Sequence, residues 1–159
     1  MAANATITVS AVVLTRPDGT VLTVRKSGTQ MFMLPGGKPE ERETPRDTAV
    51  REIREELGLE LAPESLTLLG EFNTDAANEA ETTLLAHVFE YPKFDDRIDV
   101  APQAEIVECQ WVLPTDPEVY TSPVTAPLNA DLVFPLLAQR DVDTSIAAAH
   151  TELHDGTST

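Results

Sequence analysis

Short apolar runs separated by turn signals open the chain. Residues 6–14 (TITVSAVVL) and 19–24 (GTVLTV) are rich in β-branched and aliphatic side chains, which favours strands. The segment 16–19 (RPDG) between them has the residues of a tight turn. We therefore expect a β-hairpin, followed by a short strand at 31–34 that residues 35–37 (PGG) end in a loop.

The next segment has the periodicity of an amphipathic helix. Its apolar side chains recur at helical spacing and form one face, made of Ala49, Val50, Ile53 and Leu57. The ends of the segment carry suitable caps: Thr44 as N-cap, Pro45 at the first helical position, Asp47 as the acidic partner of a capping box, and Gly58 after the last turn. The pattern predicts a helix from Thr44 to Leu57, with its glutamates projecting largely away from the core.

The second half of the chain predicts more strands and one more helix. Strands are expected at 66–72, 82–91 and 106–113. A helix is expected at 128–139, kinked at Pro135, with an apolar side formed by Leu132, Val133, Leu136 and Leu137. This order predicts an α/β (α+β) fold, an α/β/α sandwich with a mixed β-sheet, in a single domain over 1–140. The tail 141–159 lacks an apolar stripe, so we expect no stable element there.

Charge narrows the choice of partner. The chain has 27 acidic and 11 basic residues, a net charge of −16, which argues against a nucleic-acid duplex or an anionic membrane. A small anionic ligand is still compatible, if divalent cations lie between carboxylates and phosphates. Cys109 is the single cysteine, and no apolar run is long enough for a transmembrane helix or signal segment. We expect a cytoplasmic protein with Cys109 packed against the core.

Three glutamates on the first predicted helix could bind a metal ion. Glu52, Glu55 and Glu56 are spaced i, i+3 and i+4, which places their carboxylates on one helix face within about 5–6 Å of one another. Like charges so placed repel one another unless cations or water screen them. Mg²⁺ prefers such oxygen ligands and also binds phosphates. The alternative is a solvated acidic face in which Arg51 and Arg54 pair with these glutamates.

The sequence around these glutamates matches a longer pattern. Nine positions with fixed spacing are filled, by Gly37, Glu43, Arg51, Glu52, Ile53, Glu55, Glu56, Gly58 and Leu59. The stretch resembles the Nudix box, the signature of a family of hydrolases that cleave diphosphate-linked nucleosides. One unspecified position differs, since Arg42 stands where many members have glycine, and this could alter the shape of the loop.

The resemblance implies roles for residues in the box and beyond it. Glu52, Glu55 and Glu56, with Gly37 contributing from the backbone, would hold Mg²⁺, with Mn²⁺ as a substitute. Arg51 would orient a carboxylate, and Glu43 would be either a further ligand or a partner of the helix. The implied reaction is attack of metal-activated water on a phosphorus of the diphosphate. The base would come either from the box or from a glutamate in a later strand or loop. Of the later glutamates, Glu105 is the best candidate and Glu108 the second, although both could be surface charges flanking a strand.

The resemblance also suggests a substrate. The loop Gly36, Gly37 and Lys38 is similar to that of MutT-like enzymes, which hydrolyse nucleoside triphosphates, oxidised ones included, to a monophosphate and pyrophosphate. Asn129 would read a purine edge or cap the last helix, and Arg25 or Lys26 would meet phosphate or base, unless they are strand-end charges.

Other activities stay open. Hydrolysis of ADP-ribose or a nucleotide sugar is the enzymatic alternative, and a non-catalytic nucleotide-binding module is the other. The expected partner is a small nucleotide. Many small family members dimerise, so a homodimer stays open as well.

Overall fold

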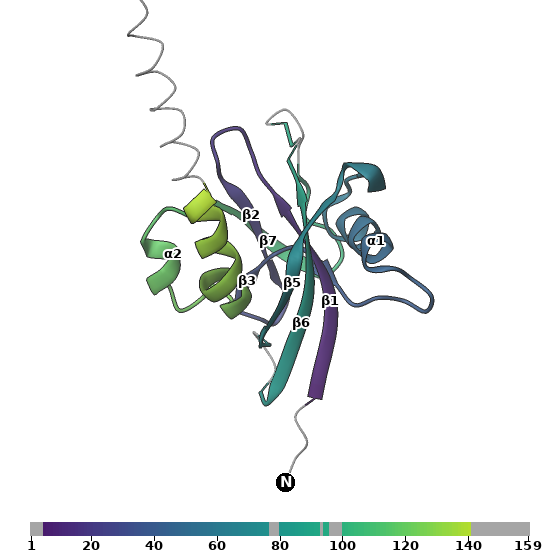
Figure 1. Ribbon diagram of the computed structural model, residues 1–159, viewed down its shortest axis with the longest axis horizontal. Helices are drawn as coiled ribbons and strands as arrows, with labels where there is room; N and C mark the ends of the chain where they lie inside the picture. The colour runs from purple at the N-terminus through teal and green to yellow at the C-terminus, as the bar shows by residue number, and fades with distance from the viewer. Residues whose placement is uncertain (1–4, 77–79, 93, 96–99, 141–159) are drawn as a thin grey trace, which may run out of the picture.

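Seven strands form two sheets at the centre of the computed structural model, which describes residues 5–76, 80–92, 94–95 and 100–140 (Figure 1). The first sheet has the order β4-β1-β6-β5. Its strands are β1 (Ala5–Leu14), β4 (Gly36–Gly37), β5 (Thr67–Asp75) and β6 (Thr82–Tyr91). β1 runs parallel to β6, and the other pairs are antiparallel, so this sheet is mixed. The second sheet, with the order β3-β2-β7, is antiparallel and consists of β2 (Val21–Lys26), β3 (Phe32–Met33) and β7 (Ile106–Val112).

Helices cover both sides of the strands (Figure 1). Alternate residues of β1 point to opposite faces, as the pleat of a strand requires. Val12 and Leu14 pack with α1 (Pro45–Leu57) in one core cluster, whereas Ala11 and Val13 pack in a second cluster with the C-terminal helical segment. The predicted α/β/α sandwich with a mixed sheet is therefore confirmed, with the strands divided between two sheets.

The hairpin predicted for the first two strands is only partly correct. The turn forms as expected, with the Gly19 N–H donating to Arg16 O at 2.9 Å. Beyond it, β1 and β2 share the single bridge Thr15–Val21 and then diverge into different sheets. Each strand has a long partner elsewhere, β6 for β1 and β7 for β2, and the sequence pattern does not encode that choice.

Helix α1 agrees with the sequence at both ends. The Asp47 N–H donates to the Thr44 hydroxyl at 3.1 Å, and the Thr44 N–H donates back to the Asp47 carboxylate at 3.3 Å. Gly58 ends the helix in a left-handed conformation, with φ of 69°. One expectation is wrong: Glu56 does not project away from the core but is buried, with 1% of its surface exposed.

The helix predicted for 128–139, with a kink at Pro135, forms in a different way from the one expected. It begins with the π-helical segment η2 (Leu128–Val133), in which the Phe134 N–H donates to the Asn129 carbonyl, and it continues in α-helical form over 134–140. The wide turn precedes Pro135 and shifts the apolar stripe by one position. Phe134 is fully buried, whereas Leu136, predicted on the apolar side, is 44% exposed.

Shorter elements complete the described part of the chain. They are η1 (Pro63–Ser65), a single 3₁₀ turn, and α2 (Glu118–Thr121), which lies beside the last helix (Figure 1). Cys109 is half-buried against the α1 core, as predicted. Among the described residues, no helix combines the length and apolar character needed to cross a lipid bilayer. The predicted tail 141–159 lies outside the described residues.

Candidate active site

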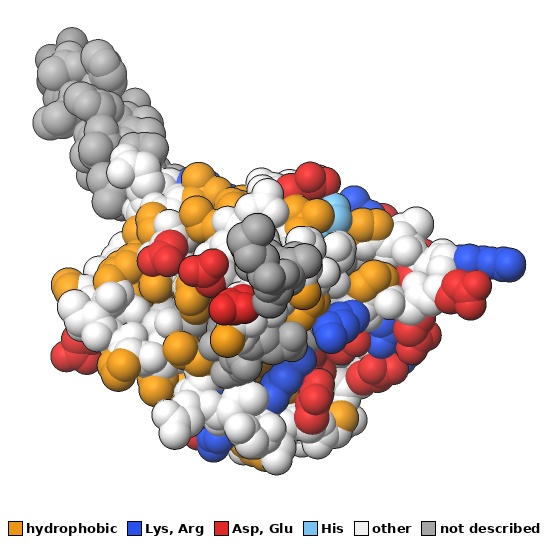
Figure 2. Space-filling model, turned by 90° about the horizontal axis from the view of Figure 1, so that it is seen from below, with side chains coloured by type: hydrophobic (Ala, Val, Ile, Leu, Met, Phe, Trp, Pro, Cys, Tyr) orange, Lys and Arg blue, Asp and Glu red, His pale blue; other side chains and the backbone are white. Residues whose placement is uncertain are grey.

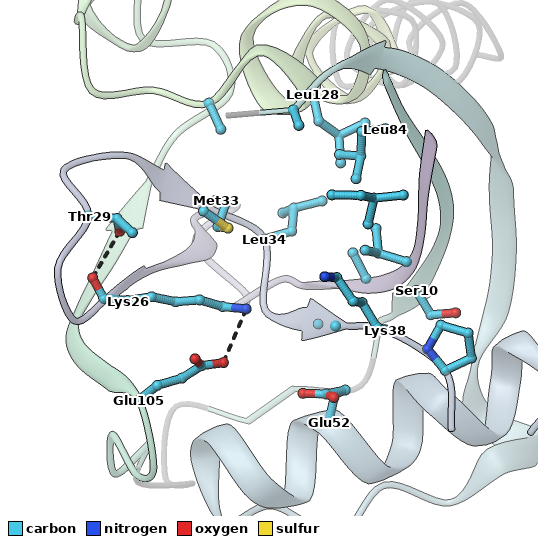
Figure 3. A pocket seen from close by; sticks show the side chains of 18 of the residues that line it. Ser10, Lys26, Thr29, Met33, Leu34, Lys38, Glu52, Leu84, Glu105 and Leu128 are labelled. Atoms are coloured by element: carbon cyan, nitrogen blue, oxygen red, sulfur yellow. Dashed lines mark hydrogen bonds and ion pairs between the residues drawn. The ribbon is translucent and has the colours of Figure 1, made fainter. Parts of the chain in front are cut away.

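A cavity of about 650 Å³ opens between α1, the strands and the start of the last helix (Figure 3). Its two sides differ in chemistry. One side is aliphatic and is formed by Ile7, Val9, Met33, Leu34, Leu84 and Leu128. The other carries charged side chains and includes Lys26, Lys38, Glu40, Arg51, Glu52 and Glu105. A ligand with an apolar or aromatic body and an anionic end would match this division.

Two glycines let the backbone pass close to the charged side. Gly36 pairs with Ala11 of β1 and has a φ of 157°, and a β-carbon there would collide with the Ser10 backbone. A β-carbon on Gly37 would lie 2.5 Å from the carboxyl carbon of Glu52. The expected loop is thus a two-residue strand whose lack of side chains leaves room for the Glu52 carboxylate.

Glu56 is a buried carboxylate next to this strand. One oxygen, Oε1, accepts a hydrogen bond from the Gly36 N–H at 3.2 Å. The other oxygen, Oε2, is buried and has no hydrogen-bond partner among the described residues. Burial, and then the nearby Glu52, raise the pKa of Glu56 to about 8, although Lys26 and the Gly36 N–H act in the opposite direction. Glu56 therefore has an unmet need for a proton or a cation.

Arg51 organises the other glutamates of the helix. Its side chain is 12% exposed. The guanidinium donates to both oxygens of Glu43 at 2.7 and 2.9 Å, to Glu52 at 2.9 Å and to Glu55 at 3.1 Å. The hydrogen bonds to Arg51 lower the pKa of Glu43 to about 2, and the same pair raises the pKa of Arg51. Of the two roles expected for Glu43, its position fits the partner of the helix.

The donor set fits a divalent cation at Glu52 and Glu56. Within the described ranges, no three acidic, histidine or cysteine side chains already converge as metal ligands. Neither Glu55 nor Glu56 is among the residues that line the cavity, but the two differ in their surroundings. Glu55 is 49% exposed and is held by Arg51, whereas Glu56 is buried behind Gly36. The unpartnered oxygen of Glu56 and the adjacent Glu52 carboxylate are hard oxygen donors that Mg²⁺ or Mn²⁺ would satisfy.

Glu105 reaches the cavity from the turn before β7. Its side chain lies 3.2 Å from the Lys26 ammonium and faces Glu52 across the cavity (Figure 3). Backbone hydrogen bonds hold this turn on both sides, from the Gln103 N–H to Glu56 O and from the Ser27 N–H to Glu105 O. Ala104 has a φ of 53°, a strained value for a residue with a β-carbon. Such strain persists where the surrounding structure fixes a conformation, as at many functional sites.

Three other candidates are not brought into the cavity. Arg25 donates to Glu108 and to the Thr29 carbonyl, and neither Arg25 nor Glu108 lines the cavity. Asn129 is fully buried, and its amide nitrogen lies 3.5 Å from the Phe32 carbonyl. It does not cap the helix, because Pro127 occupies the N-cap position.

The sequence did not identify the aliphatic side of the cavity. Ile7 and Val9 alternate with exposed residues on β1, a pattern that fits any half-buried strand. Asp75 and Ala76, from the polar loop after β5, also line the cavity, while residues 77–79 lie outside the described part.

Comparisons with known proteins identify the family. The sequence pattern of the NUDIX domain matches residues 5–132. The chain therefore belongs to the Nudix family, and its fold and sequence signature are those of a Nudix hydrolase. A comparison with curated proteins gave no match.

Solved structures share the fold. A MutT protein from Methanosarcina mazei Go1 aligns with a TM-score of 0.70 and 20% identity, over 89% of this chain and 99% of that one. The ORF135 protein of E. coli aligns with a TM-score of 0.64 and 26% identity, over 86% and 91%. A bifunctional NMN adenylyltransferase/ADP ribose pyrophosphatase from Francisella tularensis, complexed with AMP and a Mn ion, has a TM-score of 0.65 and 16% identity, over 86% of this chain and 42% of that one.

Proposed function

We propose that this protein is a Mg²⁺-dependent hydrolase of nucleoside triphosphates, oxidised ones included, that releases a nucleoside monophosphate and pyrophosphate. The observation that carries the proposal is the division of the cavity. Aliphatic side chains suit a base and sugar, and the charged side suits a phosphate chain. The family match supports cleavage of a diphosphate bond.

The residues divide the work as follows. A divalent cation held by Glu52 and Glu56 would neutralise phosphate charge and make water a better nucleophile. Lys38 lines the cavity and would bind phosphate oxygens, with the backbone of Gly36 and Gly37 allowing close approach. Arg51 positions Glu52 through its 2.9 Å bond. Glu105 would take the proton from the attacking water.

Two observations bear on Glu105 as the base. Its side chain is 58% exposed, so that water reaches it, and it faces Glu52 across the cavity (Figure 3). Glu108, the second candidate, is paired with Arg25 and does not line the cavity. Glu105 is therefore the better placed of the two.

The test is a substrate panel measured with Mg²⁺ and with a chelator. The panel contains nucleoside triphosphates, oxidised purine triphosphates, ADP-ribose and nucleotide sugars, and the readout is release of pyrophosphate or monophosphate. We expect metal-dependent turnover of triphosphates. Preference for ADP-ribose or nucleotide sugars would replace this substrate class, and silence across the panel in folded protein would favour a binding module.

A pair of variants links turnover to the cavity. Glu52→Gln removes a charge that lines the cavity, and turnover should fall about 100-fold or more. Glu41→Gln removes the same charge from an exposed position outside the cavity and should leave turnover unchanged. Equal effects of the two substitutions would contradict this location of the site.

A further inference from the structure

Two neighbouring ion pairs connect β2 with β7 and with the turn that precedes it, and only one of them faces the cavity. Lys26 pairs with Glu105 at 3.2 Å, and both residues line the cavity. Arg25 pairs with Glu108 at 3.1 Å, and neither lines it. The register shifts between Arg25 and Lys26, so that an irregularity of the β-bulge type separates the two pairs. Bulges commonly re-aim side chains beside functional sites.

Lys26 has several acidic neighbours. Its ammonium contacts Glu105, and its charge also acts on the buried Glu56. Glu52 faces the same space from α1 (Figure 3). On one face of the molecule, Lys and Arg side chains gather between groups of Asp and Glu (Figure 2). An anion that binds the Lys26 ammonium must therefore compete with the carboxylates around it.

The Lys26–Glu105 ion pair is weak, so that an anionic ligand can replace Glu105. The Glu105 side chain is 58% exposed and that of Lys26 is 25% exposed, so their attraction is screened by water and is worth little. A diphosphate carries more negative charge than one carboxylate and offers Lys26 more acceptor oxygens. A diphosphate that enters the cavity is therefore expected to attract Lys26 more strongly than Glu105 does.

We propose that the phosphate chain of the substrate replaces Glu105 as the ion-pair partner of Lys26. The Glu105 carboxylate is then free to accept a proton from water only when substrate is bound in the cavity. The proposal rests on the function proposed above and adds a positioning role for Lys26. The turn that carries Glu105 stays fixed, because Gln103 and Ser27 hold its backbone. Only the side-chain pairing changes.

The experiment is a double-mutant cycle on the full chain with inorganic pyrophosphate as the probe. Binding is measured by calorimetry in Mg²⁺ at one fixed pH. Lys26→Met should weaken pyrophosphate binding about tenfold. Glu105→Gln should tighten it, by about threefold, because Lys26 loses its competitor. In the double variant, the Glu105→Gln gain should disappear.

Controls separate competition from a general change in charge. Glu108→Gln removes the same charge from the neighbouring pair and should not alter pyrophosphate binding. Lys26→Arg keeps the charge and should restore most of the binding lost in Lys26→Met, provided that each variant melts near the wild-type temperature. A gain in Glu105→Gln that persists without Lys26, or that Glu108→Gln reproduces, would overturn the proposal.

The cycle also distinguishes two kinds of failure. If wild-type protein binds pyrophosphate and the Lys26 and Glu105 variants bind it equally well, competition is excluded while the proposed function stands. If wild-type protein binds no pyrophosphate, the displaceable pair is overturned together with the assignment of the charged side to phosphates.

Discussion

Two glutamates of the Nudix box are treated in opposite ways by the same fold. Glu43, just before α1, has both oxygens bonded by Arg51 and accepts further hydrogen bonds from the Glu40 N–H and the Thr48 hydroxyl. Glu56, near the end of α1, is buried with one oxygen unpartnered among the described residues. The bonds to Arg51 lower the pKa of Glu43 to about 2, and burial raises the pKa of Glu56 to about 8.

The difference distinguishes a glutamate that supports the structure, Glu43, from one that is suited to the reaction, Glu56. Glu43 is stable as an anion in the protein alone, because every demand of its carboxylate is met. Glu56 is costly as an anion until a positive charge arrives. Two glutamates that the same sequence motif specifies therefore have different roles. The one before the helix makes supporting contacts, and the one near its end is suited to bind a cation.

The largest expected effect is on turnover. Glu56→Gln keeps an acceptor for the Gly36 N–H but removes the charge that would hold a cation, so turnover should fall about 100- to 1000-fold. Glu43→Gln weakens only the contacts that position Arg51, so its loss should be smaller, about tenfold. The measurement is kcat/KM for both variants at saturating Mg²⁺.

The same two variants should differ in stability. Without metal and above pH 8, Glu56→Gln should melt at a higher temperature than the wild type, because the wild-type protein then buries a charged carboxylate and the variant buries a neutral amide. Glu43→Gln should melt at a lower one, because it leaves Arg51 less well paired. Unchanged turnover in Glu56→Gln would remove this residue from the cation site.

A second effect is the dependence of stability on pH, which has opposite signs for the two glutamates. The pKa of Glu56 is higher in the folded state than its ordinary 4.5, so the folded state binds more protons between pH 4.5 and about 8. Its contribution is present below pH 4.5 and is lost as the pH rises through that window, a change of about 5 kcal/mol at about 1.4 kcal/mol per pH unit. The pKa of Glu43 is lowered, so its contribution is present above pH 4.5 and is lost as the pH falls towards 2.

Urea unfolding in a chelator measures both slopes, and each variant isolates one residue. Glu56→Gln should flatten the decline between pH 4.5 and 8, and Glu43→Gln should reduce the loss in acid. Adding Mg²⁺ should restore wild-type stability at the alkaline end and leave Glu56→Gln unaffected. A wild-type decline that Glu56→Gln retains would assign it to other groups.

The fold was predictable where local chemistry decides it. The ends of α1 follow from Thr44, Asp47 and Gly58, whose capping preferences hold in almost any context. The separation of β1 and β2 into two sheets was not predictable, because it depends on partners about 80 to 90 residues away in the sequence. The sequence also did not predict the π-helical turn before Pro135, because a proline indicates that the helix is disturbed but not which form the disturbance takes.

The site was predictable as a motif but not as a set of environments. Spacing places Glu52, Glu55 and Glu56 on one turn of helix, yet they end up partly buried, exposed and fully buried. Which glutamate is buried depends on how α1 lies against β4, a matter of tertiary packing. Sequence also named Arg25 and Lys26 together, while only Lys26 lines the cavity.

The smallest expected effect tests the supporting end of the box, at Arg42. Its φ is 67°, the left-handed conformation that costs a residue with a β-carbon about 1 kcal/mol or more. The loop before Glu43 thus keeps a backbone shape suited to glycine, although the sequence has arginine there. Arg42→Gly should raise stability by about 0.5–1 kcal/mol, after the greater freedom of glycine in the unfolded chain is subtracted, and should leave turnover unchanged.

Thermal melts of Arg42→Gly and of a neighbouring control give the answer. Glu41 is exposed and has no positive φ, so Glu41→Gly should bring only the entropic cost of glycine and lower stability by a few tenths of a kcal/mol to about 1 kcal/mol. Opposite signs at adjacent positions would locate the strain at Arg42 itself. Stabilisation by both substitutions would instead mean that the whole loop is strained, and destabilisation by both would mean that contacts of the Arg42 side chain outweigh its backbone cost.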